Sequence, residues 1–246
     1  MEPQIQVVKI GTECVLGKNG LHDETIKMRA KEMQEIDSDE GIKTILVVSG
    51  AIGLGKAQCG NTEQNEDLSS IELQRYACIG QPALVRFYAN AFEDIYNVSQ
   101  LLVTSKDLEK EGHVRDRIMD DVKNDIVTLI NYNDGIDFEE LRQDNDTLAA
   151  TVAKYINAKR LILLGKKYDG MLDSNKKLIE KVDYIDDNLY KMCNGVSNNG
   201  TGGFEVKLDA AKMLMEAGIE MIISNINYDL RDVVAGRVPR TLFRND

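Results

Sequence analysis

The sequence contains no tryptophan, and histidine and proline are scarce, with two and three residues among 246. Its four cysteines are scattered and form no C-x-x-C pair, so neither a zinc site nor a disulfide framework is indicated. No apolar run reaches the ~18 residues that a transmembrane helix needs. The first residues, MEPQIQ, lack the basic and apolar regions of a signal peptide. We therefore expect a cytoplasmic protein with no membrane contact.

Positive charge is also in short supply, because 30 Lys and Arg face 41 Asp and Glu and leave a net charge of −11. An acidic surface repels a phosphate backbone, so nucleic-acid binding is excluded as the main task. A small anionic ligand would need a local group of cations and backbone N–H groups inside an otherwise acidic protein.

Apolar strand patterns alternate with helical patterns along the whole chain. The length of the chain fits one large domain, 1–246. Continuous apolar strands between helices predict a parallel or mostly parallel sheet covered on both faces, a three-layer αβα sandwich of the α/β class. The expected strands are 5–10, 43–50, 98–104, 125–133, 159–165 and 220–225. The expected helices lie near 23–36, 69–96, 113–124, 144–157 and 205–217.

Unusual residues fall where these strands end. Lys9 and Gly11 close the first strand, and Ser49 and Gly50 close the second. Polar residues also follow the strands that end near 131–134 and 165–167. Parallel α/β sheets bind ligands in the crevice outside the carboxyl ends of their strands, so this edge is the expected site. An ammonium at the end of a buried strand requires an anionic partner there.

The segment VVSGAIGLGKA, residues 47–57, nearly satisfies the P-loop pattern, with Gly50, Gly55 and Lys56 at the right spacing after a strand. Ala57 stands where a P-loop needs a Ser or Thr hydroxyl for Mg²⁺, which argues against that motif. The alternatives are a strand-to-helix turn at Ser49 whose N–H groups meet an anion, and a tight turn with no ligand.

A second glycine loop at 200–203 opens a helix that places Lys207 about one turn in. A cation near the positive end of the helix dipole is unfavourable unless a phosphate lies over that end. The alternative is a solvated lysine on an amphipathic helix.

The segment INYNDGIDFEELRQDNDTLAATVA, 130–153, places Asp134 at a strand end and Asp144, Asn145 and Asp146 before a helix. Helix capping explains one of these aspartates on its own. Taken together with Lys9, the two glycine loops and Lys207 at one sheet edge, the residues predict a phosphate-transfer crevice that is not a P-loop.

These motifs occur in an order that resembles the amino acid kinase superfamily and, within it, the glutamate 5-kinases. The resemblance rests on VVKIGT, VVSGAIGLG, RYACIGQPALVRFYANAF, QLLVTSKDL, LINYND, RQDNDTLAATVA and GTGGFEVKLDAAKMLMEAG, and runs from Val7 to about Phe243. It implies a kinase domain without the C-terminal PUA domain that many members carry. The part at about 1–157 would hold the acceptor and the part at about 158–246 the nucleotide.

The resemblance implies transfer of the γ-phosphoryl group of ATP to the side-chain carboxylate of L-glutamate, the first step of proline biosynthesis. It also implies Mg²⁺ carried mainly by the nucleotide phosphates, with no metal ligand among the side chains, and a homodimer or homotetramer. The residues that it assigns to catalysis are Lys9, Lys207 and Asp146. Those assigned to the acceptor are Ser49, Gly50, Asp134, Asp144 and Asn145. Those assigned to the nucleotide are Lys9, Gly11, Gly165, Lys166, Thr201, Gly202, Gly203 and Lys207.

The sequence departs from the family pattern at Tyr132 and Gln143, beside the acceptor residues, and at Gly165 and Lys166, on the nucleotide side. The segment LLGKKYDG there resembles the loop of uridylate kinases in the same superfamily. Two alternatives therefore stay open beside a glutamate kinase. One is a kinase for another acidic amino acid or a nucleoside monophosphate, and the other is a non-catalytic homologue that binds a ligand without turnover.

Overall fold

The structure is a computed structural model that describes residues 3–17, 20–21, 23–109, 112–137, 144–193 and 204–245. Its elements in chain order begin with β1 (Gln4–Ile10), α1 (Thr12–Val15), β2 (Leu16–Gly17), β3 (Gly20–Leu21), α2 (Asp23–Glu40), β4 (Ile42–Val48), α3 (Ala51–Gln58), a 3₁₀ turn (Asn65–Asp67), α4 (Ser70–Phe92) and β5 (Asn97–Val103). They continue with α5 (Ser105–Leu108), α6 (His113–Lys123), β6 (Ile126–Tyr132), α7 (Asn145–Tyr155), β7 (Arg160–Gly165), β8 (Lys181–Val182), α8 (Asp187–Cys193), α9 (Phe204–Glu216), β9 (Glu220–Asn225), α10 (Leu230–Ala235) and β10 (Arg240–Phe243).

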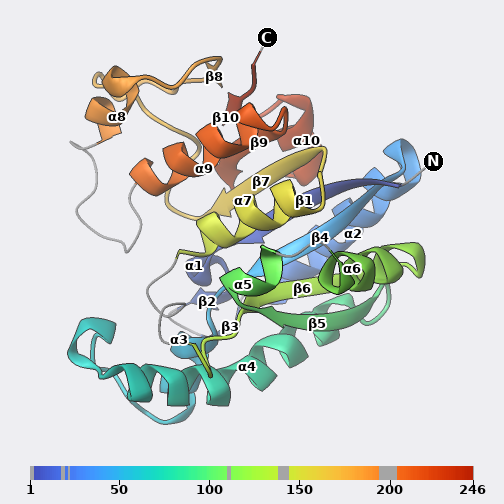
Figure 1. The fold of residues 1–246 in the computed structure, drawn as a ribbon, viewed down its shortest axis with the longest axis vertical. Coiled ribbons are helices and arrows are strands. Elements are labelled where there is room, and N and C mark those ends of the chain that lie inside the picture. The colour runs from blue at the N-terminus through green and yellow to red at the C-terminus, as the bar shows by residue number, and fades with distance from the viewer. Residues whose placement is uncertain are drawn as a thin grey trace.

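One sheet runs through the molecule in the order β5-β6-β4-β1-β7-β9-β10-β8, with helices on both sides (Figure 1). The strands from β5 to β9 pair in parallel, whereas β10 pairs antiparallel with β9 and parallel with β8. The three-layer αβα class and the mostly parallel sheet predicted from the sequence are confirmed.

Each central strand is buried on both faces, which explains why the strands read as continuous apolar runs. On one face Val7, Ile45 and Leu163 pack against α6, α7 and α9. On the other face Val8 and Leu46 pack against α2, α3, α4 and α10. Because side chains alternate along a strand, Lys9 lies on the same face as Val7, beneath α7 and α9.

The strand register brings the expected residues to one edge of the sheet. Lys9 of β1 lies beside Val47 of β4 and Leu163 of β7. Gly165, the last residue of β7, lies beside Asn225, the last residue of β9. The turns after β1, β4, β7 and β9 therefore leave the sheet at the same level, where a ligand crevice is expected.

Helices α3 and α4 approach each other more closely than side chains would allow. A Cβ atom added to Gly55 would lie 1.9 Å from the Tyr76 carbonyl oxygen, and one added to Gly80 would lie 1.8 Å from the Ala51 carbonyl oxygen. The start of α3 therefore rests directly on the backbone of α4. This contact fixes the direction of the turn that joins β4 to α3.

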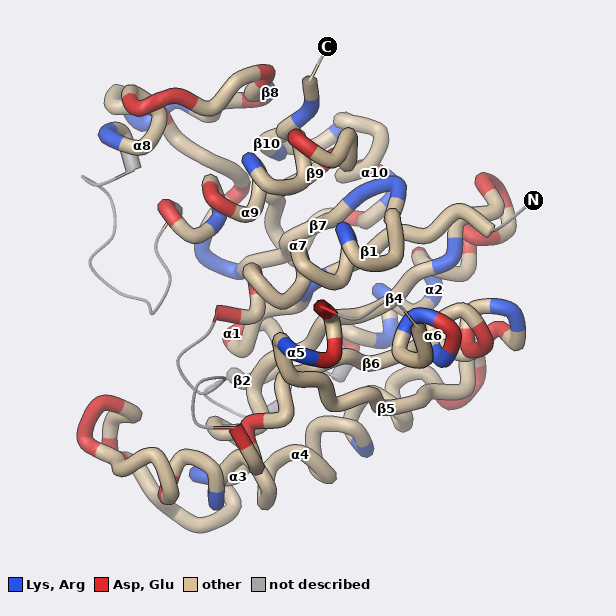
Figure 2. Tube along the Cα trace, in the orientation of Figure 1, with Lys and Arg blue, Asp and Glu red and all other residues tan. Residues whose placement is uncertain are grey.

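Charged residues are unevenly distributed along the chain (Figure 2). Acidic residues gather in the segment before α4 and around β8. In the described part of the chain, none of the helices has the length and apolarity that a bilayer crossing needs. The sequence predictions omitted the short elements α10, β8 and β10, and ended α2 four residues too early.

Candidate active site

The centre of the site is the carboxylate of Asp146, the second residue of α7. Its Oδ1 atom lies 2.6 Å from the Lys9 Nζ atom, and its Oδ2 atom accepts a hydrogen bond of 2.6 Å from the Lys207 Nζ atom. The Asp146 side chain is 1% exposed, and those of Lys9 and Lys207 are 12% and 9% exposed. Lys9 and Lys207, which the resemblance assigns to catalysis together with Asp146, thus converge on its carboxylate, and the alternative of Lys207 as a solvated surface lysine is wrong.

Asp146, Lys9 and Lys207 form a triad in which burial and charge act against each other. Burial alone would lower the pKa of Lys9, but the Asp146 carboxylate outweighs it, so the pKa lies above its usual value. Burial would raise the pKa of Asp146, but the two ammonium groups hold it below its usual value. Lys9 and Asp146 are therefore both charged at neutral pH, and two lysine side chains face the single carboxylate of Asp146.

Two aromatic rings flank the Lys207 ammonium. Its Nζ atom lies 5.5 Å from the centre of the Tyr168 ring and 5.9 Å from that of Phe204, within the range of a cation–π contact. The two rings meet edge to face at 5.8 Å. The ring of Tyr168 also covers Gly165, where an added Cβ atom would lie 2.3 Å from the ring. The rings restrict where the ammonium can move.

Asn145 joins Asp146 to the turn after β4. Its Nδ2 atom lies 2.5 Å from the Ser49 Oγ atom, 3.1 Å from the Val48 carbonyl oxygen and 3.2 Å from the Asn131 Oδ1 atom. Asn131 in turn donates to the Gln81 Oε1 atom at 3.2 Å. Hydroxyl and amide groups from β4, β6, α4 and α7 therefore converge beside the triad.

Gly50 follows Ser49 and has a φ of 117°, a left-handed conformation that favours glycine. Asp144 caps α7 by accepting a hydrogen bond of 2.7 Å from the Asp146 N–H group. Burial and the neighbouring Asp146 carboxylate raise the pKa of Asp144. Asp134 lies two residues beyond β6 and is half-buried. Of the residues predicted to bind the acceptor, the structure joins Ser49 and Asn145 by a hydrogen bond and places Asp144 next to them at the start of α7.

On the nucleotide side, Gly165 is buried at the end of β7 and Lys166 is exposed after it. The Gly11 N–H group donates to the Leu164 carbonyl oxygen at 3.3 Å, so this predicted nucleotide contact is not a free donor. The predicted contacts Thr201, Gly202 and Gly203, and the departure at Gln143, lie outside the described residues.

The lysine of the near match to a P-loop at 47–57 bonds to a loop outside the triad. Lys56 lies near the end of α3 and donates to the Glu63 carbonyl oxygen and to the Asn65 Oδ1 atom. This lysine therefore holds the loop before α4, as the argument from Ala57 against a P-loop led us to expect.

Sequence reasoning assigned no role to Gln81, Tyr168 or Phe204. Tyr168 follows a strand end by three residues and Phe204 is the first residue of the helix that carries Lys207, so both have positions near the edge. Aromatic residues in such loops are common in cores as well, and the pattern alone does not separate the two cases. Gln81 lies inside a long helix, where only the packing of α4 on the β4–α3 turn brings it to the site.

The donor set fits a polyphosphate. Two ammonium groups share one carboxylate, and each has further N–H groups available for phosphate oxygens. Among the described residues, no group of three or more His, Cys, Asp or Glu side chains could hold a metal ion.

An αβα domain with paired lysines at the carboxyl edge of its sheet is suited to bind a nucleotide polyphosphate. The model of the Amino acid kinase family matches residues 4–225, and the chain belongs to this family. This confirms the resemblance that the motifs indicated, and it supports a phosphoryl-transfer role and the transferase and kinase predictions.

Curated relatives include glutamate 5-kinases. The chain is 34% identical to that of Caldanaerobacter subterraneus over 96% of its own length and 67% of the relative. It is 33% identical to that of Vibrio campbellii over 98% of its length and 64% of the relative. For Clostridium perfringens the identity is 34%, over 96% of this chain and 94% of the relative. The chain thus spans about two thirds of the longer relatives.

Among solved structures, the fold is similar to two UMP kinases. The enzyme of Ureaplasma parvum has a TM-score of 0.66 at 16% identity and covers 98% of this chain and 99% of its own. The enzyme of Bacillus anthracis has a TM-score of 0.67 at 15% identity and covers 100% and 98%. At these identities the likeness concerns the fold alone.

Proposed function

We propose that this protein transfers the γ-phosphoryl group of ATP to the side-chain carboxylate of L-glutamate and forms glutamyl 5-phosphate, the first step towards proline. The observation that carries the proposal is the convergence of Lys9 and Lys207 on Asp146, directly beside Asn145 and Ser49. Two lysines beside hydroxyl and amide groups support a phosphate site next to an acceptor site. The glutamate 5-kinase relatives support the choice of acceptor.

On the nucleotide side, Lys9 and Lys207 neutralise the phosphate oxygens and Asp146 holds both lysines in place. Such preorganised cations stabilise charge on the transferring group, and removal of one donor of this kind slows comparable enzymes by about 10²–10³. Mg²⁺, when bound through the phosphates, supplies further neutralisation. Gly165, Lys166 and the segment that includes Thr201, Gly202 and Gly203 are the other proposed contacts.

On the acceptor side, Ser49, Gly50 and Asn145 position the glutamate, while Asp134 and Asp144 favour an acceptor that bears an ammonium group. The acceptor carboxylate, with a pKa near ~4.3, is already ionised at neutral pH, so the reaction needs no general base. A carboxylate oxygen forms the new bond to the γ-phosphorus as the bond to the β,γ-bridging oxygen breaks. ADP leaves with that electron pair, and no proton is transferred.

The test is a coupled ADP-release assay with MgATP and a panel of acceptors. L-glutamate should give turnover, and hydroxylamine should trap its acyl phosphate as the hydroxamate. N-acetyl-L-glutamate is the matched control, because it keeps the side-chain carboxylate and lacks the ammonium group. We expect it to give little or no turnover.

Three other outcomes contradict the proposal in different ways. Turnover with another acidic amino acid or with UMP, and none with glutamate, would replace the acceptor and keep the phosphate site. Equal turnover with glutamate and its N-acetyl derivative would remove the role of Asp134 and Asp144. Ligand binding without any turnover would identify a non-catalytic homologue.

A further inference from the structure

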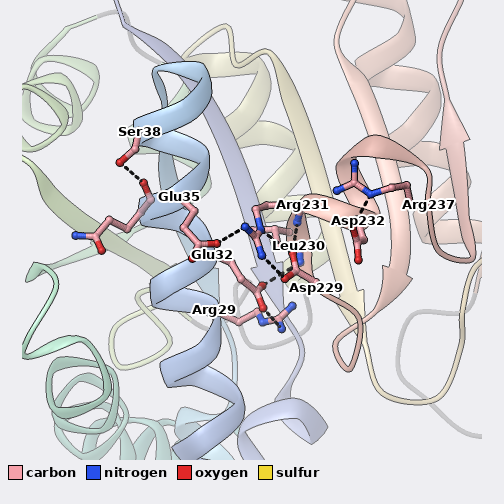
Figure 3. A network of polar contacts seen from close by, with 10 residues as sticks. Arg29, Glu32, Glu35, Ser38, Asp229, Leu230, Arg231, Asp232 and Arg237 are labelled. Carbon is pink, nitrogen blue, oxygen red and sulfur yellow. Dashed lines mark hydrogen bonds and ion pairs between the residues drawn. The ribbon is translucent and has the colours of Figure 1, made fainter.

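A second buried ion pair joins helix α2 to the turn between β9 and α10 (Figure 3). Arg29 is 2% exposed, and its two terminal nitrogens bind the Tyr228 carbonyl oxygen and, at 2.6 Å, the Glu32 Oε1 atom. The other oxygen of Glu32 accepts a hydrogen bond of 2.9 Å from the Leu230 N–H group. The pair therefore bonds to the turn at two backbone positions, the Tyr228 carbonyl oxygen and the Leu230 N–H group.

The opposite side of the same turn is bonded to the loop after β7, residues 165–169. The Ile226 N–H group donates to the Gly165 carbonyl oxygen at 2.8 Å. The Asn225 Nδ2 atom lies 3.0 Å from the Asp169 Oδ1 atom and 3.3 Å from the Lys166 carbonyl oxygen. The turn thus lies between α2 and the 165–169 loop and is bonded to both.

That loop reaches the reacting side of the molecule through Tyr168. The Tyr168 ring covers Gly165 and lies 5.5 Å from the Lys207 ammonium. A shift of the turn would move the loop, and the loop would move the ring that restricts Lys207. An unbroken series of contacts therefore connects α2 to the nucleotide side of the site.

A buried ion pair is weak evidence for stability, because apolar residues of similar volume often stabilise a protein as well or better. Directional bonds to the Tyr228 carbonyl and the Leu230 N–H group do what apolar contacts cannot, since they fix the position of a backbone segment. The arrangement is therefore better explained by geometry than by stability.

We propose that Arg29 and Glu32 are positioning residues that set the affinity for ATP by holding the β9–α10 turn and, through it, the 165–169 loop. The inference rests on the proposed function only in taking the nucleotide to bind beside Lys207. It does not depend on which acceptor is used.

The experiment compares Glu32→Gln with Glu35→Gln, a matched control one turn further along α2. Glu35 pairs with Arg231 at the surface, where both side chains are more than 40% exposed. Binding of the β,γ-imido analogue of ATP with Mg²⁺ is measured by calorimetry in the absence of acceptor. We expect Glu32→Gln to weaken binding about fivefold, within the range of remote coupling energies, and Glu35→Gln to leave it unchanged.

A second variant, Asn225→Ser, breaks the other side of the turn and leaves the ion pair intact, so the test survives if Glu32→Gln does not fold. Both variants should raise the KM for ATP and leave the KM for glutamate and kcat within about twofold. Their effects should be less than additive when combined, because both act through one segment. Purely structural roles would lower the melting temperature and leave nucleotide binding unchanged.

Unchanged binding of the analogue by folded Glu32→Gln and Asn225→Ser overturns the inference and leaves the proposed function standing. Equal rises in the KM of ATP and glutamate also overturn it, because they report a general loosening. If the unsubstituted chain binds the analogue and does not turn over glutamate, the proposed acceptor fails and the inference is still decided by calorimetry.

Discussion

The carboxylates that the described part of the chain buries beside cations include Asp146 at the sheet edge and Glu32 on α2, and the pKa values of these two shift in opposite directions. Two ammonium groups hold the pKa of Asp146 below its usual value. Burial raises the pKa of Glu32 to about 7, although Arg29 and the Leu230 N–H group act against it. The carboxylates have comparable burial, so the cations around them decide the sign.

The difference separates the proposed binding site at Asp146 from a structural contact at Glu32. At Asp146 the cations outnumber the carboxylate, and their partly exposed side chains can meet an additional anion. Glu32 pairs with the Arg29 guanidinium, and the second terminal nitrogen of Arg29 and the second oxygen of Glu32 both bond to the protein backbone. Two lysines that share one carboxylate and can meet a further anion therefore support a ligand site, whereas a pair bonded to the backbone on both sides supports a fixed contact.

The largest effect should come from Lys207→Met, which keeps the length of the side chain and removes its charge. We expect kcat to fall by about 10²–10³, because one of two preorganised cations at the transferring phosphate is lost. Lys212→Met, at an exposed position on the same helix, is the control. Initial rates of ADP release and a circular dichroism spectrum measure the two effects. If Lys207→Met loses activity only because it does not fold, Lys207 has a structural role and not a catalytic one.

Asp146→Asn should lower the free energy of unfolding by about 3–5 kcal/mol at pH 7, because two buried ammonium groups lose their carboxylate. The depressed pKa of Asp146 contributes stability above the unfolded pKa of about 3.9, and this is lost as pH falls through the folded pKa. The difference in the free energy of unfolding between Asp146→Asn and the unsubstituted protein should therefore narrow below about pH 4.

Urea unfolding at a series of pH values measures this gap. Asp39→Asn, on the exposed face of α2, is the control and should show no gap at any pH. A gap for Asp146→Asn that stays constant down to pH 3 would mean that the ion pairs do not stabilise the fold.

Asn145→Ala tests the acceptor side of the first cluster. Loss of the amide that lies 2.5 Å from Ser49 should raise the KM for glutamate about tenfold, the effect of ~1.4 kcal/mol, and change kcat less. Asn90→Ala on the exposed face of α4 should leave both constants unchanged. Steady-state kinetics decide the matter, and an unaltered KM for glutamate would remove Asn145 from the acceptor site.

The smallest effect should be the pH dependence of Glu32→Gln, with a sign opposite to that of Asp146. The raised pKa of Glu32 means that its contribution to stability is complete below about pH 4.3 and lost as pH rises through about 7. Arg29, Asp229, Arg231 and the Leu230 N–H group face this carboxyl.

The unsubstituted protein should therefore lose stability relative to Glu32→Gln between pH 5 and pH 8, as measured by urea unfolding. Glu35→Gln should show no such trend. If the unsubstituted protein instead gained stability relative to Glu32→Gln over that range, the opposite pKa shifts of Glu32 and Asp146 would be contradicted.

Much of the first cluster could be predicted from the sequence. Apolar strands that alternate with helices imply a parallel sheet, and a parallel sheet brings its strand ends to one edge. That rule alone places Lys9, Ser49 and the residues after β6 together, before any side-chain packing is known. Lys207 and Asp146 could be predicted because polar residues mark the start of the two helices that carry them.

The second cluster could not be predicted in the same way. Arg29 and Glu32 are three residues apart in a helix rich in charge, which usually indicates a solvent-exposed face. They are buried by α10, an element of six residues with too little sequence to show a helical period. Short elements that depend on tertiary contacts leave little trace in the sequence, and residues beneath them are misjudged for the same reason.

The contact of Gly55 and Gly80 has a consequence for changing the acceptor. Ser49 precedes a helix that rests on the α4 backbone with no intervening side chain. A methyl group added at either glycine would push α3 away from α4, and the serine would be displaced with it. Redesign of acceptor preference therefore has to leave these two positions untouched, although neither would touch the substrate.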